Sequence, residues 1–136
     1  MSQHAESAQP TVGDYMQENV LTIPADATLK EVGQSLLDNQ VSTLLVTEGG
    51  EYVGIISDRR LAREGLAKGL PPETTVVREI MRQKLLTIER DQPVREAQAM
   101  MKVNGVRHLV VTKQEKIVGI VSISDLIRYY SDFFEK

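Results

Sequence analysis

The stretch Val53-Gly54-Ile55-Ile56-Ser57 recurs as Val118-Gly119-Ile120-Val121-Ser122, with an offset of 65 residues between the two copies. The same offset places Leu21-Thr22-Ile23 on Leu86-Thr87-Ile88, and no gap is needed between the two matches. Identities that keep one offset over most of a chain indicate an internal repeat. The sequence is therefore a tandem duplication, and a fold assigned to one half must also suit the other.

Both repeats have the same predicted order of elements, β-α-β-β-α, so the predicted fold class is α+β. Apolar and β-branched runs predict strands at 20–23, 44–47 and 52–56 in the first repeat, and at 85–88, 108–112 and 117–121 in the second. Thr28 and Glu31 form a capping-box pattern ahead of the first long helix. Ser57 and Ser122 are good N-cap residues for the last helix of each repeat.

The repeats set the predicted domain organisation. We expect a disordered arm at 1–10, a first repeat at 11–68, a linker with Gly and Pro at 69–75, and a second repeat at 76–136. A short helix is expected ahead of Met16 and of Met81. Because one repeat alone has a small sheet with little to cover it, the two are expected to share a core about a pseudo-twofold axis.

The composition is that of a globular protein, with 41% hydrophobic and 26% charged residues. Lys and Arg number 16 against 19 Asp and Glu, and a net charge of -3 disfavours a general attraction to nucleic acid or anionic membranes. Cysteine is absent, which excludes disulfides and thiolate chemistry and fits a cytoplasmic protein. No apolar run is long enough to span a membrane, and the first residues do not resemble a signal peptide.

Four segments carry a resemblance to a known family: 54–60 and 119–125, together with 41–46 and 106–111. Through them, residues 11–131 resemble the cystathionine β-synthase (CBS) domain pair, or Bateman module. Members usually have a proline where Leu45 and Val110 stand in this chain. The resemblance implies a stand-alone regulatory module that binds an adenine nucleotide (AMP, ADP or ATP) at one cleft. It also implies a homodimer, with signalling through dimer geometry or through a client protein.

Ser122 and Asp125 are the main candidate site residues. The N-terminal end of a helix capped by Ser122 favours an anion. Asp125 lies one turn further on, where its carboxylate can accept two hydrogen bonds from the vicinal hydroxyls of a ribose. The resemblance implies the same role for both residues; the alternative is that they only cap the helix. Gly119 allows a neighbouring backbone or a ligand to approach closely.

Arg107, His108 and Lys84 are the candidate phosphate contacts. Arg107 and His108 begin a predicted strand, so their side chains point to opposite faces, while the resemblance implies that both lie near phosphate. Arginine can bind phosphate oxygens with two hydrogen bonds. The alternative for all three is an exposed position without a ligand. The candidate residues for an apolar adenine slot are Leu86, Thr87, Ile88 and Val106, for which the alternative is ordinary core packing.

The first repeat departs from this pattern. Arg60 stands where the second repeat has Asp125, so the acceptor for hydroxyl groups is missing. Ser42 and Thr43 replace the two phosphate donors of the middle strand, although Ser57 keeps the N-cap position. We therefore expect one competent site, built on the second repeat. Arg60 is expected to be solvated, or else to reach a ligand phosphate.

The sequence contains no recognisable catalytic motif. Its histidines, His4 and His108, have no metal-ligand spacing, and no Ser-His-Asp set, Walker loop or Gly-x-Gly-x-x-Gly is present. We expect no enzyme, no metal and no required cofactor. The main prediction is a nucleotide-binding regulatory module, and the alternative is a ligand-free module that dimerises and docks on a client protein. Nucleic acid and membranes are not expected partners.

The last predicted helix, 125–134, has an apolar face. Its members are Leu126, Ile127, Tyr130, Phe133 and Phe134. We expect this face to pack mainly in the core, although a surface rich in aromatic residues also favours a protein partner.

Overall fold

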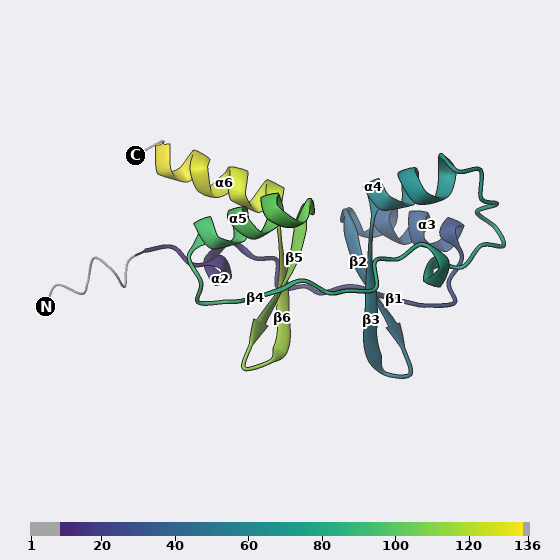
Figure 1. The fold of residues 1–136 in the computed structure, drawn as a ribbon, viewed down its shortest axis with the longest axis horizontal. Helices are drawn as coiled ribbons and strands as arrows, with labels where there is room; N and C mark the ends of the chain where they lie inside the picture. The colour runs from purple at the N-terminus through teal and green to yellow at the C-terminus, as the bar shows by residue number, and fades with distance from the viewer. Residues whose placement is uncertain (1–8, 135–136) are drawn as a thin grey trace, which may run out of the picture. The chain divides into compact units, whose positions relative to one another are not determined.

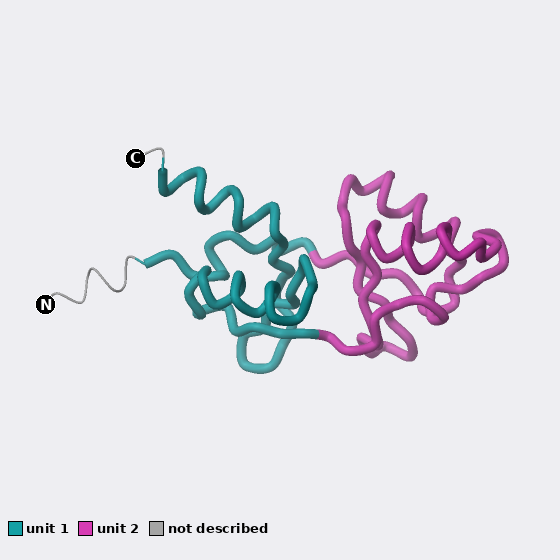
Figure 2. The backbone as a smooth tube through the Cα atoms, turned by 45° about the horizontal axis from the view of Figure 1, so that its top comes forward, with its two compact units in different colours: residues 1–19, 86–136 teal, residues 20–85 magenta. Residues whose placement is uncertain are grey.

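The computed structural model describes residues 9–134, which form two compact units (Figure 2). One is an uninterrupted stretch of chain, Val20–Leu85, and we call it the continuous unit. The other joins residues 9–19 to residues 86–134, and we call it the split unit. The predicted arm at 1–10 lies almost entirely outside the described residues.

The continuous unit is a three-stranded sheet with helices (Figure 1). Its strands are β1 (Thr22–Pro24), β2 (Thr43–Glu48) and β3 (Glu51–Ser57). Its helices are α3 (Leu29–Asn39), α4 (Asp58–Arg60), the π-helical η1 (Leu61–Leu66) and the 3-10 turn η2 (Val77–Glu79). β1 runs parallel to β2, and β2 runs antiparallel to β3.

The split unit repeats this plan. Its strands are β4 (Thr87–Glu89), β5 (His108–Lys113) and β6 (Lys116–Ser122), and its helices are α2 (Val12–Tyr15), α5 (Val94–Asn104) and α6 (Ile123–Phe134). β4 is parallel to β5, and β5 is antiparallel to β6. The predicted β-α-β-β-α order and the α+β class are therefore confirmed. The first strand of each repeat begins two residues later than predicted.

Each unit has its own apolar core, formed where one face of the sheet meets the long helix. In the continuous unit Leu44, Val46 and Ile56 pack with Leu29 and Val32 of α3. α3 begins as the capping-box pattern predicts, since the Thr28 hydroxyl accepts the Glu31 N–H at 3.1 Å and the Glu31 carboxylate accepts the Thr28 N–H at 2.8 Å. The split unit has an equivalent core on β5, β6 and α5.

A strap of extended chain completes each unit, and it comes from the other repeat. We call residues 11–19 the N-terminal strap and residues 76–84 the middle strap. The backbones of Gln17 and Ile120 exchange hydrogen bonds of 2.8 and 3.0 Å in the split unit. Arg82 and Ile55 exchange two of 2.9 Å at the equivalent place in the continuous unit. The compact units therefore do not coincide with the repeats at 11–68 and 76–136.

Gly54 and Gly119 make room for the straps. A Cβ atom on Gly119 would lie 2.7 Å from the Gln17 carbonyl oxygen, and one on Gly54 would lie 2.9 Å from the Arg82 carbonyl oxygen. Both distances are shorter than a carbon and an oxygen can approach without displacement. The close neighbour predicted at Gly119 is thus the backbone of the N-terminal strap, and Gly54 has the backbone of the middle strap at the equivalent place.

The segment predicted as a linker, 69–75, also packs in the continuous unit, because Leu70 packs against its core and Thr75 and Pro72 accept hydrogen bonds from the start of α3. One expectation differs from the structure. The apolar face of α6 is not mainly in the core. Leu126 is buried, but Phe133 and Phe134 are 59% and 77% exposed.

Candidate functional site

Asp125 lies in the first turn of α6, where Ser122 ends β6 and caps the helix. The backbone N–H and the hydroxyl of Ser122 donate to Asp125 Oδ2 at 2.8 and 3.0 Å. The Asp125 N–H in turn donates to Ser122 Oγ at 3.3 Å. This reciprocal arrangement is the aspartate form of a capping box, and it fixes one carboxylate oxygen at the helix N-terminus.

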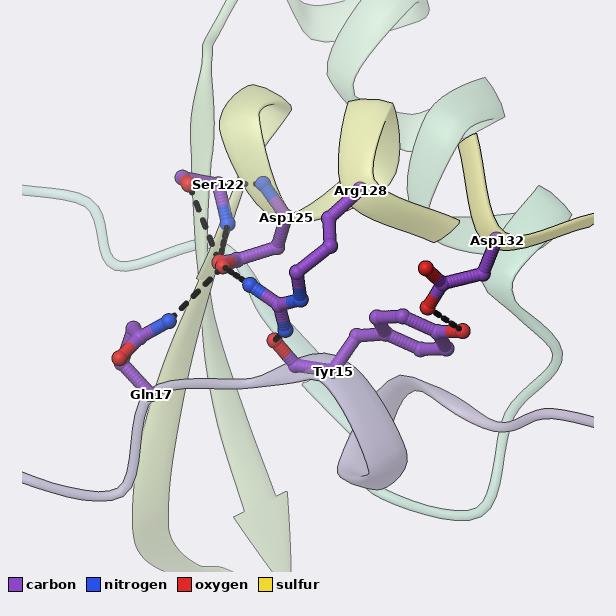
Figure 3. A network of polar contacts seen from close by, with 6 residues as sticks. All are labelled: Tyr15, Gln17, Ser122, Asp125, Arg128 and Asp132. Carbon is purple, nitrogen blue, oxygen red and sulfur yellow. Dashed lines mark hydrogen bonds and ion pairs between the residues drawn. The ribbon is translucent and has the colours of Figure 1, made fainter. Parts of the chain in front are cut away.

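The other carboxylate oxygen binds the strap and the next turn of the helix (Figure 3). Asp125 Oδ1 accepts from Gln17 Nε2 at 2.9 Å and from Arg128 Nη1 at 3.1 Å. The Asp125 side chain is only 4% exposed. An ionised carboxylate has about four lone-pair positions, and here four donors use them. Within residues 9–134, no buried side-chain nitrogen or oxygen lacks a hydrogen-bond partner.

Arg128 extends the network to Tyr15. Its Nη2 donates to the Tyr15 carbonyl at 2.9 Å, and its guanidinium lies 5.1 Å from the centre of the Tyr15 ring. The Tyr15 hydroxyl donates to Asp132 Oδ2 at 2.9 Å (Figure 3). This hydrogen bond, followed by partial burial and the charge of Asp132, raises the pKa of Tyr15 above its usual value of 10.0. The strap is therefore joined to α6 by polar contacts with three residues of the helix.

Backbone pairing places two of the three predicted phosphate residues, Arg107 and His108, beside this cap. His108 is the cross-strand partner of Ser122, and the Arg107 carbonyl accepts the Ile123 N–H at 3.0 Å. The Arg107 side chain is exposed. Lys84 is also exposed, but it belongs to the continuous unit.

The predicted adenine slot is divided between core and surface. Ile88 is 5% exposed and packs in the core of the split unit, whereas Thr87 is exposed at the start of β4. Leu86 and Val106 are half-buried against the same core. Ile88 is thus a core residue, as the alternative allowed, and the accessible part of such a slot would come from the other three.

Arg60 occupies the equivalent position in the continuous unit and has a different role. Its backbone N–H donates to Ser57 Oγ at 3.0 Å, which keeps the helix cap. Its Nε donates to the carbonyl of Ile80 in the middle strap. Arg60 is therefore a half-buried contact to the strap rather than the fully solvated arginine expected from the sequence. At the position of His108, the buried Thr43 donates to the Ile56 carbonyl at 3.1 Å.

Sequence reasoning missed Gln17, Arg128 and Tyr15. Arg128 could have been found, because an aspartate followed three residues later by an arginine is a common ion-pair spacing on a helix. Gln17 could not, because it lies 108 residues from Asp125 and reaches it only through the strap.

Two other features, a metal-binding cluster and a membrane-spanning helix, were sought among the described residues. Between residues 9 and 134, no cluster of three or more His, Cys, Asp or Glu side chains could hold a metal ion. No helix in that stretch is long and apolar enough to cross a membrane.

Comparison with known proteins identifies a family. The family model described as CBS domain matches residues 12–67 and 77–132. An uncharacterized protein of Methanopyrus kandleri is 31% identical over 120 residues, which cover 87% of this chain and 61% of that protein. That relative is therefore considerably longer than the present chain.

Two solved structures share the fold. An uncharacterized conserved protein from Pyrococcus horikoshii matches with a TM-score of 0.83 and 25% identity, over 90% of this chain and 92% of that one. The CBS domain pair of protein MJ0100, in complex with 5-methylthioadenosine and S-adenosyl-L-methionine, matches with a TM-score of 0.80 and 23% identity. That match covers 91% of this chain and 98% of the other, and at this identity it concerns the fold alone.

Proposed function

The chain belongs to the CBS domain family as a tandem pair, a type of regulatory module, and we propose that it binds an adenine nucleotide through Asp125. The observation that carries the proposal is a buried carboxylate held at the start of α6, with Ser122 beside it. A carboxylate in this position suits the vicinal hydroxyls of a ribose, because both can donate to it.

The neighbouring residues support the same ligand. Arg107 is exposed close to the helix cap and is free to meet phosphate oxygens, with which a guanidinium makes paired hydrogen bonds. We assign His108, the cross-strand partner of Ser122, to the same phosphate group. Leu86, Thr87 and Val106 would receive the base, with Ile88 behind them in the core. The solved structure of this fold with two adenosine compounds adds S-adenosylmethionine and methylthioadenosine to the ligands worth testing.

The expected affinity is micromolar. Covering an adenine of roughly 150 Å² gains on the order of 4 kcal/mol at ~25 cal/mol/Å². Ribose and phosphate contacts must then offset the cost of association and the loss of contacts that Asp125 already makes. A regulatory module of this kind would respond to an abundant metabolite, and binding would shift its assembly or its affinity for a client protein.

Isothermal titration calorimetry tests the proposal. Native protein is titrated with AMP, ADP, ATP, S-adenosylmethionine and methylthioadenosine, alongside Asp125→Asn and Asp125→Ala. Loss of charged hydrogen bonds should weaken binding about ten- to a hundredfold in both variants. Asp91→Ala is the matched control, because Asp91 is an exposed carboxylate of the same unit outside the network. Unchanged binding by Asp125→Asn, or no binding by native protein, would refute the ribose assignment.

The exposed end of α6 favours a second candidate function, a ligand-free module that forms a homodimer. Ile127, Phe133 and Phe134 are 63%, 59% and 77% exposed, and aromatic side chains of this kind are enriched in interfaces. Light scattering at micromolar concentration should show a dimer that Phe133→Ser with Phe134→Ser converts to a monomer. Leu66→Ser, which changes an exposed apolar residue of the continuous unit, is the control. A monomeric native protein would exclude this candidate.

A further inference from the structure

The N-terminal strap is attached to the split unit at two places. At its outer end, the N–H groups of Val12 and Gly13 donate to the carbonyls of Gln92 and Arg90, both at 2.8 Å, and the Val12 side chain is fully buried. At its inner end, residues 15–17 are held by Asp125, Arg128 and the backbone of Ile120. The outer attachment is apolar and backbone in kind, whereas the inner one combines the two backbone hydrogen bonds between Gln17 and Ile120 with contacts of the charged side chains of Asp125 and Arg128.

The inner attachment uses the same carboxylate that the proposed ligand requires. Asp125 accepts four donors, and its capacity is about four. Two ribose hydroxyls that donate to it must therefore replace two of the present donors. Free capacity would exist only if some of the four contacts were lost first.

Gln17 and Arg128 are the donors that can be replaced. The two contacts from Ser122 are local to the start of α6, and their loss would remove the helix cap. Gln17 and Arg128 share the other oxygen, and Arg128 is 47% exposed, so its guanidinium can move into solvent. Moving Arg128 also removes its hydrogen bond to the Tyr15 carbonyl and its contact with the Tyr15 ring.

The middle strap has no such dependence. Arg60 donates directly to the Ile80 carbonyl, and no carboxylate stands between the strap and the helix. A ligand that binds a carboxylate would therefore leave residues 80–82 in place.

We propose that a ligand at Asp125 and the inner end of the N-terminal strap compete for the same carboxylate, so that binding loosens residues 15–17 by removing their contacts with Asp125 and Arg128. This inference rests on the proposed function and adds its regulatory output. In the occupied state residues 15–17 are held by fewer contacts, mainly the backbone bridge to Ile120, while the outer end of the strap stays attached. Gln17 and Arg128 are positioning residues that set the ligand affinity by competing for the carboxylate.

Calorimetry on Gln17→Ala tests the competition. Removing one competing donor should tighten binding of the nucleotide about three- to tenfold. Gln98→Ala, a glutamine of α5 that bonds Tyr130 rather than Asp125, is the matched control and should bind as native protein does. Weaker binding by Gln17→Ala would overturn the inference, because it would place Gln17 among the ligand contacts. Equal affinity would overturn it as well.

Amide hydrogen exchange provides the second readout. With saturating nucleotide, exchange should rise at Gln17 and stay unchanged at Arg82, its counterpart in the middle strap. Without any ligand, Asp125→Asn should produce a similar rise at Gln17, because the neutral amide accepts fewer of the same hydrogen bonds. Binding without a rise at Gln17 would overturn this inference and leave the proposed function standing. A rise in Asp125→Asn with no nucleotide binding at all would overturn the proposed function, and with it the competition, while keeping the strap attachment.

Discussion

In each unit an arginine donates a hydrogen bond to the equivalent carbonyl of the strap. The two arginines stand at different positions of the helix that follows the last strand. In the split unit Arg128 bonds the Tyr15 carbonyl and is itself held by Asp125. In the continuous unit Arg60, at the position of Asp125, bonds the equivalent Ile80 carbonyl directly. One residue thus does in the continuous unit what two do in the split unit. The continuous unit has no carboxylate at this position, and its arginine holds the strap directly, so only the split unit has this acceptor for a ligand.

The largest effect is expected at the glycines that admit the straps. Gly119→Ala and Gly54→Ala should each lower the free energy of unfolding by about 1–3 kcal/mol, because a Cβ would overlap a strap carbonyl in either unit. Urea denaturation measures this change in the free energy of unfolding. Gly33→Ala in α3 is the control, since its Cβ would lie 3.7 Å from Leu61 and should stabilise the helix by up to about 1 kcal/mol. If only one of the two substitutions lowered the free energy of unfolding, the two straps would not be equivalent.

A smaller effect is expected at the two hairpin turns. The β2–β3 turn places Gly49 and Gly50 at positive φ of 61° and 81°, whereas the β5–β6 turn places Gln114 and Glu115 at 54° and 68°. Glycine adopts this region at little cost and other residues do not. Glu115→Gly should therefore raise the free energy of unfolding by about 0.5–1 kcal/mol, and Gly50→Ala should lower it by a similar amount. The same denaturation measurement applies, and a destabilised Glu115→Gly would contradict the proposed difference between the turns.

The smallest effect is expected at high pH, where Tyr15 of the split unit loses its proton. The pKa of Tyr15 is raised in the folded protein by its hydrogen bond to Asp132, so this contribution to stability is complete below the usual value of 10.0. It is lost as the pH rises through the folded-state pKa. Amide exchange of the N-terminal strap should therefore increase above about pH 10, beyond the ordinary base-catalysed rise seen at the middle strap. In Tyr15→Phe the amide exchange of the two straps should depend on pH in the same way. If the N-terminal strap of this variant still exchanged faster at high pH, Tyr15 would be excluded as the cause.

The elements were predictable because their patterns are local. The capping box of Thr28 and Glu31 and the N-caps at Ser57 and Ser122 follow from residue type and spacing, and the structure shows each of them. The π-helical turn η1 was not predicted, since nothing in its residue types distinguishes it from an ordinary helix.

The exchange of straps was not predictable in the same way. Consecutive repeats suggest consecutive units, and the backbone bridge between Gln17 and Ile120 depends on no particular side chain. The glycine at 119 indicated a close neighbour without identifying it. At the candidate site, Ser122 and Asp125 were found because helix caps are local, but the occupation of the carboxylate by Gln17 depends on a contact across 108 residues.

The reciprocal straps also have a consequence for the origin of the chain. A single ancestral repeat with this design would have had to exchange its leading segment with a second molecule, as domain-swapped dimers do. Such an exchange depends on protein concentration, whereas fusion of two copies makes it intramolecular at an effective concentration on the order of millimolar. Gene duplication would then have made the pairing permanent. It would also have let the two copies differ at one helix position, where one has Asp125 and the other has Arg60.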